Sequence, residues 1–346
     1  MLALVQFAAA AAVTEIPPFL RGDVTIGYAA DQLTGHLAER TADGDVQLAA
    51  RSLTDHRLHY GVAFGAGPGV AVFLDVPHYA ASTVAYSERT AMVFEPATGS
   101  GTYAGTNPAD DGVLVSGAGL GGVWFGVRGT PFSEAFPRRQ SRVTWLLEGA
   151  LRPADPTSVW TAQDGNRGAG TGGFAARIHT AFSKRSGTAE TYVAGTYTHE
   201  GARELDTVDY DDATTLARKV EIDPPDAAKI RIGVEAELAS NAASGGRSSF
   251  DIHFDGNYSS WGTIASGVYL PDPLDNTRGR AVQTSESYEL GTGVAFRLRP
   301  MQYFDVALFG DIAYRLPQRV ESPYPVYTGA DTVHWVAGTD LTFRIR

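Results

Sequence analysis

The chain has 346 residues, of which 19% are charged and 43% hydrophobic, and this composition excludes an intrinsically disordered chain. Its formal net charge is −11 and it has no basic run, which argues against nucleic acid as a partner. Cysteine is absent, so disulfides, thiolate metal sites and a cysteine nucleophile are excluded.

The N-terminal residues are typical of a signal peptide. An apolar run extends from Leu2 to Val13 and includes small residues at 10–12, where an A-x-A cleavage fits. We predict a signal peptide over residues 1–12, with an incomplete n-region, followed by one domain over residues 13–346. The alternative is a short buried N-terminal helix. No later segment offers the ~18 consecutive apolar residues of a transmembrane helix.

Period-two alternation of apolar and polar residues recurs along the rest of the chain and predicts strands. It appears, in chain order, over residues 23–30, 45–64, 70–76, 123–127, 142–151, 174–182, 191–197, 229–240, 250–259, 288–298, 304–314 and 333–345. The first of these strands has the weakest pattern. The predicted fold class is therefore all-β.

The segment "KIRIGVEAELAS" (229–240) shows how the two faces of these strands differ. Its even positions from Ile230 to Leu238 are apolar, whereas its odd positions from Lys229 to Glu237 are charged or glycine. A strand of a membrane barrel presents the apolar face to lipid and turns its polar face inward. Several segments reach the ~9–11 residues that a tilted strand needs to cross a bilayer. The pattern therefore predicts a transmembrane barrel.

The connections after residue 64 alternate between short and long. The short ones span residues 65–69, 130–141, 184–189, 240–247 and 299–302, and the long ones span 78–117, 152–171, 200–227, 260–285 and 315–331. Outer-membrane barrels have short periplasmic turns and long extracellular loops. We therefore predict a single antiparallel up-and-down barrel of about twelve strands with periplasmic termini. Fourteen strands are the alternative if residues 80–94 join the wall. Residues 13–22 are expected to fold inward as a plug.

Three stretches carry a resemblance to a known family. The stretch "GAGLGGVWFGVRG" (117–129), the stretch 59–79, and "WLLEGALRPAD" followed by "GTGGFAARIHTAFSKR" resemble the meta-pathway phenol-degradation family, which is similar to the FadL-type outer-membrane transporters. Gly122 stands where that family has aspartate. The resemblance implies an outer-membrane barrel and a channel for hydrophobic or aromatic compounds. It implies no catalytic residue.

Two other motifs are interpreted without a ligand. G-x-G-x-x-G occurs at 117–122 and 168–173, but each copy precedes a predicted strand rather than the helix that a dinucleotide needs. The acidic "DYDD" (209–212) lacks the spaced oxygen ligands of a calcium loop. We predict no cofactor and no metal.

The inward-facing charges form the candidate functional site. As lumen-lining residues we predict Glu148, Arg177, His179, Lys229, Arg231, Glu235, Glu237, Asp251, His253, Asp255, Glu289, Arg297, Asp305, Asp311, His334, Asp340 and Arg344, with Asp75 on the same face. These residues either line a polar conduit or fill the barrel with ion pairs.

The leading hypothesis is a channel or transporter for small, hydrophobic or aromatic solutes in the bacterial outer membrane. A non-conducting barrel that docks other envelope proteins is the alternative. A barrel hydrolase that uses His179, His253 or His334 is a third hypothesis. The expected partners are outer-membrane lipid, the barrel-assembly machinery, and a small solute or other envelope proteins.

Overall fold

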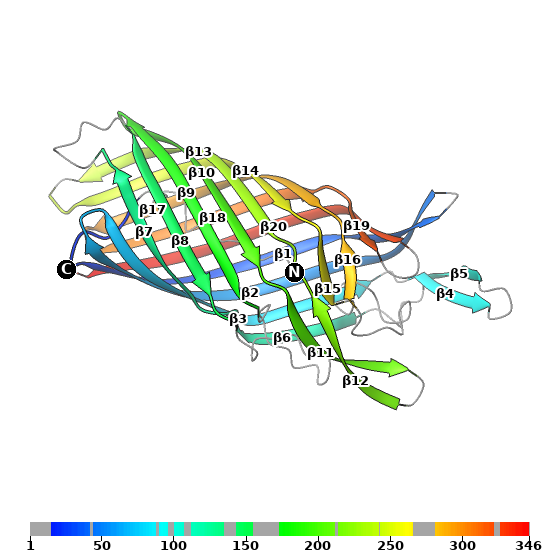
Figure 1. Ribbon diagram of the computed structural model, residues 1–346. Helices are drawn as coiled ribbons and strands as arrows, with labels where there is room; N and C mark the ends of the chain where they lie inside the picture. The colour runs from blue at the N-terminus through cyan, green and yellow to red at the C-terminus, as the bar shows by residue number, and fades with distance from the viewer. Residues whose placement is uncertain are drawn as a thin grey trace.

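Figure 1 presents a computed structural model of the chain. It describes residues 15–41, 44–87, 90–95, 100–106, 112–134, 143–154, 173–211, 214–241, 243–265, 281–321 and 326–345. The predicted signal peptide at 1–12 lies outside these residues. No helix among them is long and apolar enough to span a membrane.

Twelve antiparallel strands form the closed wall of a barrel (Figure 1). In chain order they are β1 (Gly22–Thr41), β2 (Gly44–Gly67), β3 (Val70–Ser87), β7 (Trp124–Phe132), β8 (Thr144–Arg152), β9 (Ala175–Ser186), β10 (Ala189–Glu200), β13 (Ala227–Asn241), β14 (Gly246–Ser259), β17 (Ser287–Met301), β18 (Phe304–Arg315) and β20 (Val326–Ile345). Pairing of β1 with β20 closes the wall. The twelve-stranded up-and-down barrel predicted from the sequence is confirmed.

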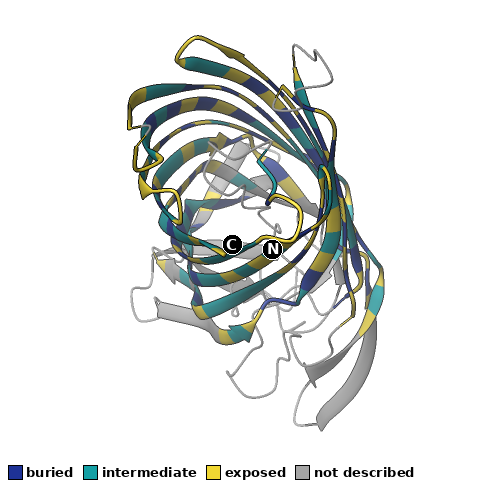
Figure 2. Ribbon diagram, turned by 90° about the vertical axis from the view of Figure 1, so that its left-hand side faces the viewer, coloured by how far each residue is buried: buried dark blue, intermediate teal, exposed yellow. Residues whose placement is uncertain are grey.

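The two faces of the wall differ in polarity as the alternation predicted. On β13, Ile230 and Ile232 are each 58% exposed, whereas Arg231 between them is 3% exposed. Figure 2 shows the same alternation of exposed and buried residues along the neighbouring strands. An apolar surface of this extent is rare on soluble proteins, and lipid is the solvent that it suits.

Aromatic side chains gather at both ends of the apolar band. Phe132, Trp145 and Phe182 stack in a row near the short turns, with ring centroids 6.0 and 5.5 Å apart. Tyr258 and Tyr288 pair at the opposite end, with centroids 5.2 Å apart. Amphipathic rings prefer the boundary between lipid and headgroups, so these contacts mark the two membrane interfaces.

The strands continue beyond the membrane on the side of the long connections, which corrects several expectations. The first strand, predicted over residues 23–30, extends to Thr41 in β1. The acidic loop predicted at 200–227 contains a hairpin of β11 (Arg203–Asp211) and β12 (Thr214–Ile222). A strand outside the bilayer has no lipid-facing side. Its sequence therefore need not alternate between apolar and polar residues, and the alternation cannot predict it.

The fourteen-stranded alternative is wrong. Residues 80–87 continue β3, while β4 (Thr90–Glu95) pairs only with β5 (Ser100–Thr106) among the described residues, in a sheet separate from the wall. The other strands outside the wall are β6 (Gly112–Leu120), β15 (Gly262–Ala265), β16 (Ala281–Thr284) and β19 (Gln318–Glu321). The first glycine motif thus ends β6 and is followed by strand β7, as predicted.

Candidate functional site

The lumen contains a cavity of about 260 Å³ in the half of the barrel nearer the short turns. The sequence-predicted residues that line it are Asp75, Glu148, Arg177, His179, Arg297, Asp305, Asp340 and Arg344. Apolar side chains share this lining, among them Phe73, Leu146 and Phe309. The remaining predicted lumen residues lie in ion-pair clusters elsewhere inside the barrel.

The chain preceding β1 enters the barrel and bounds this cavity. Glu15 and Pro17 are among the lining residues, and Ile16 packs on Leu146, Ala181 and Ala194. The segment is fastened to β2 at its other end, where the amide of Leu20 donates to the carbonyl of Gly65 at 2.9 Å. Residues 15–21 therefore form the inward-folded plug that the sequence predicted over 13–22.

An arginine pair holds the plug through Glu15. The Glu15 carboxylate accepts hydrogen bonds from Arg344 at 2.8 Å and Arg299 at 3.2 Å, and both arginines also bond to Asp305. Burial raises the pKa of Glu15, but the charges of Arg297, Arg299 and Arg344 outweigh it and lower that pKa to about 2. Glu15 is therefore ionised at neutral pH and attracted to these arginines.

One wall of the cavity, which we call the cavity side, is formed by β3, β7, β8 and β9. The guanidinium of Arg128 lies 4.4 Å from the centre of the Phe73 ring, and that of Arg177 lies 4.8 Å from the Trp124 ring. Both arginines contact the single carboxylate of Glu148, at 3.3 and 2.9 Å. Two cations thus share the Glu148 carboxylate, and Asp75 of β3 lines the same wall, so two cations face two carboxylates there.

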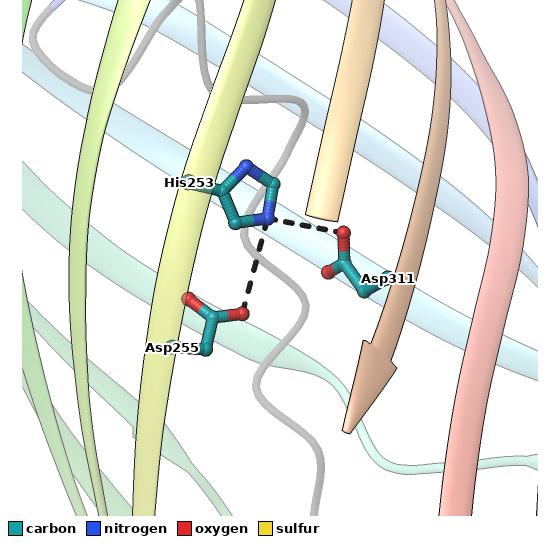
Figure 3. A group of neighbouring side chains, drawn as sticks. All are labelled: His253, Asp255 and Asp311. Atoms are coloured by element: carbon teal, nitrogen blue, oxygen red, sulfur yellow. Dashed lines mark hydrogen bonds and ion pairs between the residues drawn. The ribbon is translucent and has the colours of Figure 1, made fainter. Parts of the chain in front are cut away.

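The opposite part of the lumen, which we call the network side, is formed by β10, β13, β14, β17 and β18. Arg231 bonds to both oxygens of Asp255 at 2.7 Å and to Asp311 at 2.9 Å. Lys229 contacts Asp255 at 2.9 Å. One ring nitrogen of His253 lies 3.0 Å from Asp311, and the other lies 2.7 Å from Asp251. Figure 3 shows His253 pointing toward Asp311. This side is filled by side chains that neutralise one another.

A glycine on the intervening strand makes the contact between His253 and Asp311 possible. In the register, Gly293 of β17 lies between His253 of β14 and Asp311 of β18. A Cβ at Gly293 would come within 2.0 Å of the Asp311 carboxylate and 2.4 Å of the His253 ring. The glycines that the sequence places on the polar face thus leave room for contacts that bridge a strand.

His253, Asp255 and Asp311 also have the composition of a metal site. One potential ligand atom from each lies within 4.8 Å of the others. However, Arg231 already donates to both carboxylates and Lys229 contacts Asp255. The positive charge that a metal would bring is therefore supplied by protein side chains, and we assign no metal here.

A third cluster connects the strands where the barrel closes. The ring nitrogens of His334 on β20 lie 2.7 Å from Asp31 of β1 and 3.0 Å from Glu289 of β17. Arg57 pairs with Asp31 at 2.6 Å and Arg315 with Glu289 at 3.0 Å. All of these side chains are buried. The cluster therefore ties the closing pair of strands to the rest of the wall.

The last predicted residues lie close to the short turns or on the cavity wall. Glu235 pairs with Arg247 at 3.1 Å, and Glu237 pairs with Arg247 and with Arg185 of a neighbouring turn. On the cavity wall, Asp340 lies 3.7 Å from His59, and His179 lies 2.8 Å from Thr196.

Sequence reasoning missed three residues of the cavity side: Phe73, Trp124 and Arg128. The signal was present in their positions. Trp124, Gly126 and Arg128 alternate along β7, and Phe73 shares the face of Asp75, so continuing the period-two pattern would have placed all of them inside. Aromatic residues on the lumen face were overlooked because the lumen was expected to be polar.

Comparisons with known proteins place the chain by fold rather than by sequence. No family model and no curated protein matches the sequence. The structure is similar to that of an outer-membrane channel from Pseudomonas putida F1, with a TM-score of 0.53 at 11% identity over 97% of this chain and 100% of that chain.

Two further solved structures are similar at lower scores. A FadL homologue from Pseudomonas aeruginosa has a TM-score of 0.39 at 8% identity, covering 93% of this chain and 90% of that one. The TodX monoaromatic hydrocarbon channel has a TM-score of 0.42 at 10% identity, covering 98% of this chain and 93% of that one. With its closed wall and lipid-facing band, the chain is a β-barrel of the bacterial outer membrane, with the fold of such channels.

Proposed function

We propose that this barrel is a channel that lets small solutes with a hydrophobic or aromatic body cross the outer membrane. The observation that carries the proposal is the cavity of about 260 Å³ inside the wall, where Phe73, Leu146 and Phe309 lie beside charged groups. An apolar cavity of about 150 Å³ holds a benzene molecule, so a small ring has room here. The fold likeness to an outer-membrane channel supports the proposal.

The plug suits selective passage rather than free diffusion of hydrated ions. Residues 15–21 bound the cavity at the end nearer the short turns, and the network side is filled with ion pairs. A solute following the cavity side would have to displace or pass the plug. The charge attraction of Glu15 to its arginines makes the plug the step that limits passage.

Reconstitution tests the proposal. Wild-type protein and Glu15→Gln are inserted into planar bilayers and into liposomes. Conductance is recorded, together with uptake of benzenesulfonate, an aromatic anion that does not cross lipid unaided. We expect low conductance and measurable uptake for the wild type, and higher values for Glu15→Gln. Absence of both from both proteins would contradict the proposal.

The filled network side favours one alternative, a non-conducting barrel that docks other envelope proteins. That alternative predicts neither conductance nor uptake, so the same experiment separates the two. A hydrolase finds no comparable support. His253 and His334 each lie between two carboxylates, and His179 meets the hydroxyl of Thr196.

A further inference from the structure

We propose that the cavity side selects solutes that carry a carboxylate on a small apolar ring, and that Arg128 is the group that receives the carboxylate. The inference rests on the proposed channel function and adds the chemical class of its solute. It is drawn from the way in which the arginines, aromatic rings and carboxylate of the cavity side are arranged.

The first step concerns how Arg128 is held. The ring of Phe73 packs against β7, where a Cβ at Gly126 would come within 2.7 Å of it. The guanidinium of Arg128 lies over the same ring, 4.4 Å from its centre. A guanidinium stacked in this way loses little further freedom when it binds a planar partner. Arg128 is therefore preorganised on the cavity wall.

The second step concerns charge. Arg128 and Arg177 share the carboxylate of Glu148, and Arg177 has the shorter contact, 2.9 Å against 3.3 Å. The contact of Arg128 is made by its Nε atom, and none of the described residues forms a hydrogen bond or ion pair with its two terminal nitrogens. The Arg128 side chain is 27% exposed, compared with 11% for Arg177. Arg128 can therefore offer its fork of donors to a carboxylate.

The third step concerns the rest of the solute. Leu146, Ala307 and Phe309 also line the cavity and provide an apolar surface for a ring. Asp23, Asp75 and Asp340 line it from β1, β3 and β20. These carboxylates repel an anionic group, so an entering carboxylate is favoured where a guanidinium offers donors to it, as Arg128 does.

Equilibrium binding to the full barrel in detergent tests the inference, with benzoate and its neutral analogue benzamide as probes. We expect wild type to bind benzoate at least about tenfold more tightly than benzamide, and Arg128→Met to remove that preference. Arg128→Lys keeps the charge but not the planar fork, so it should restore part of the preference. Arg185→Met, at an exposed turn outside the cavity, is the matched control and should bind as wild type does.

The outcomes separate this inference from the proposed function. Equal binding of benzoate and benzamide by wild type, or an unchanged benzoate preference in folded Arg128→Met, would overturn the inference. Gel mobility of unboiled samples verifies that each variant is folded. If folded Arg128→Lys also loses the benzoate preference, the result still supports the inference, because it shows that the contact needs both donors of the guanidinium. If the barrel takes up solute but binds benzoate no better than benzamide, the proposed channel function stands and only the preference for carboxylates is refuted.

Discussion

The two sides of the lumen are built from the same kinds of residue but differ in how charge is balanced. On the network side, Arg231 and Lys229 meet Asp255 and Asp311 at 2.7–2.9 Å, and Arg231 and Asp255 are only 3% and 6% exposed. On the cavity side, two arginines share Glu148 and lie on aromatic rings beside open volume. Inward charges in a narrow barrel therefore do not by themselves indicate a conduit; the balance of charge and volume decides.

Among the substitutions that test this contrast, removal of Arg231 should have the largest effect on stability. Arg231→Met leaves the buried Asp255 with Lys229 alone among its two cations and removes the arginine partner of the half-buried Asp311, and we expect a loss of ~3–5 kcal/mol in the free energy of unfolding. The counterpart on the cavity side, Arg128→Met, should cost less than about 1 kcal/mol, because Glu148 retains Arg177. Urea titration of barrels folded in lipid vesicles measures both values. Similar losses for the two variants would contradict the contrast.

His334 of the cluster where the barrel closes and His179 of the cavity wall should also differ in their contribution to stability. His334→Ala leaves Asp31 and Glu289 without a shared donor and is expected to cost about 3 kcal/mol. His179→Ala removes a contact to the neutral hydroxyl of Thr196 and should cost about 1 kcal/mol. The same urea titration ranks them. A larger loss for His179→Ala would show that the His334 cluster is not what fastens β20.

Substitution of Gly293 tests how much the close packing of side chains on the network side contributes to stability. Gly293→Ala should push Asp311 and His253 apart and destabilise the barrel by about 2 kcal/mol. Gly149 lies on the lipid-facing side of β8 and has no neighbour within 4 Å of a Cβ placed there, so Gly149→Ala should be nearly neutral. The shift in the urea midpoint tests both substitutions. Equal shifts would mean that the close approach of His253 and Asp311 across Gly293 does not stabilise the barrel.

The plug should respond to pH only in the acid range. Because the pKa of Glu15 is lowered from 4.5 to about 2, its attraction to the arginines is complete above pH 4.5 and is lost as pH falls toward 2. We therefore expect wild-type conductance to stay constant between pH 8 and 5 and to rise in the acid range below about 4. Glu15→Gln should lack this rise. A rise in wild-type conductance between pH 8 and 6 would mean that a titratable group other than Glu15 holds the plug.

The fold followed from the sequence wherever lipid imposed a pattern. The alternation in residues 229–240 predicted which side chains of β13 face lipid, and the structure agrees. The pattern did not reveal the second half of β1 or the hairpin β11–β12, because no lipid constrains strands beyond the bilayer.

The pairing within the site was beyond sequence reasoning. Arg231 and Asp311 are 80 positions apart and Glu15 and Arg344 are 329 apart, so their contacts depend on the register and closure of the whole wall. Parity along a strand predicts that a side chain points inward. It does not predict which partner on another strand it meets, and hence whether it fills the lumen or lines a path.

Single cysteines test the central claim that solutes pass through the cavity, because the chain contains no cysteine of its own. Thr25→Cys places a thiol in the cavity lining, and Ser249→Cys places one at a position that is 1% exposed. Both proteins are treated with a charged methanethiosulfonate reagent while conductance and benzenesulfonate uptake are recorded. The account predicts rapid modification of Thr25→Cys with a fall in both signals, and little change for Ser249→Cys. Modification of Thr25→Cys without any effect on conductance or uptake would contradict it.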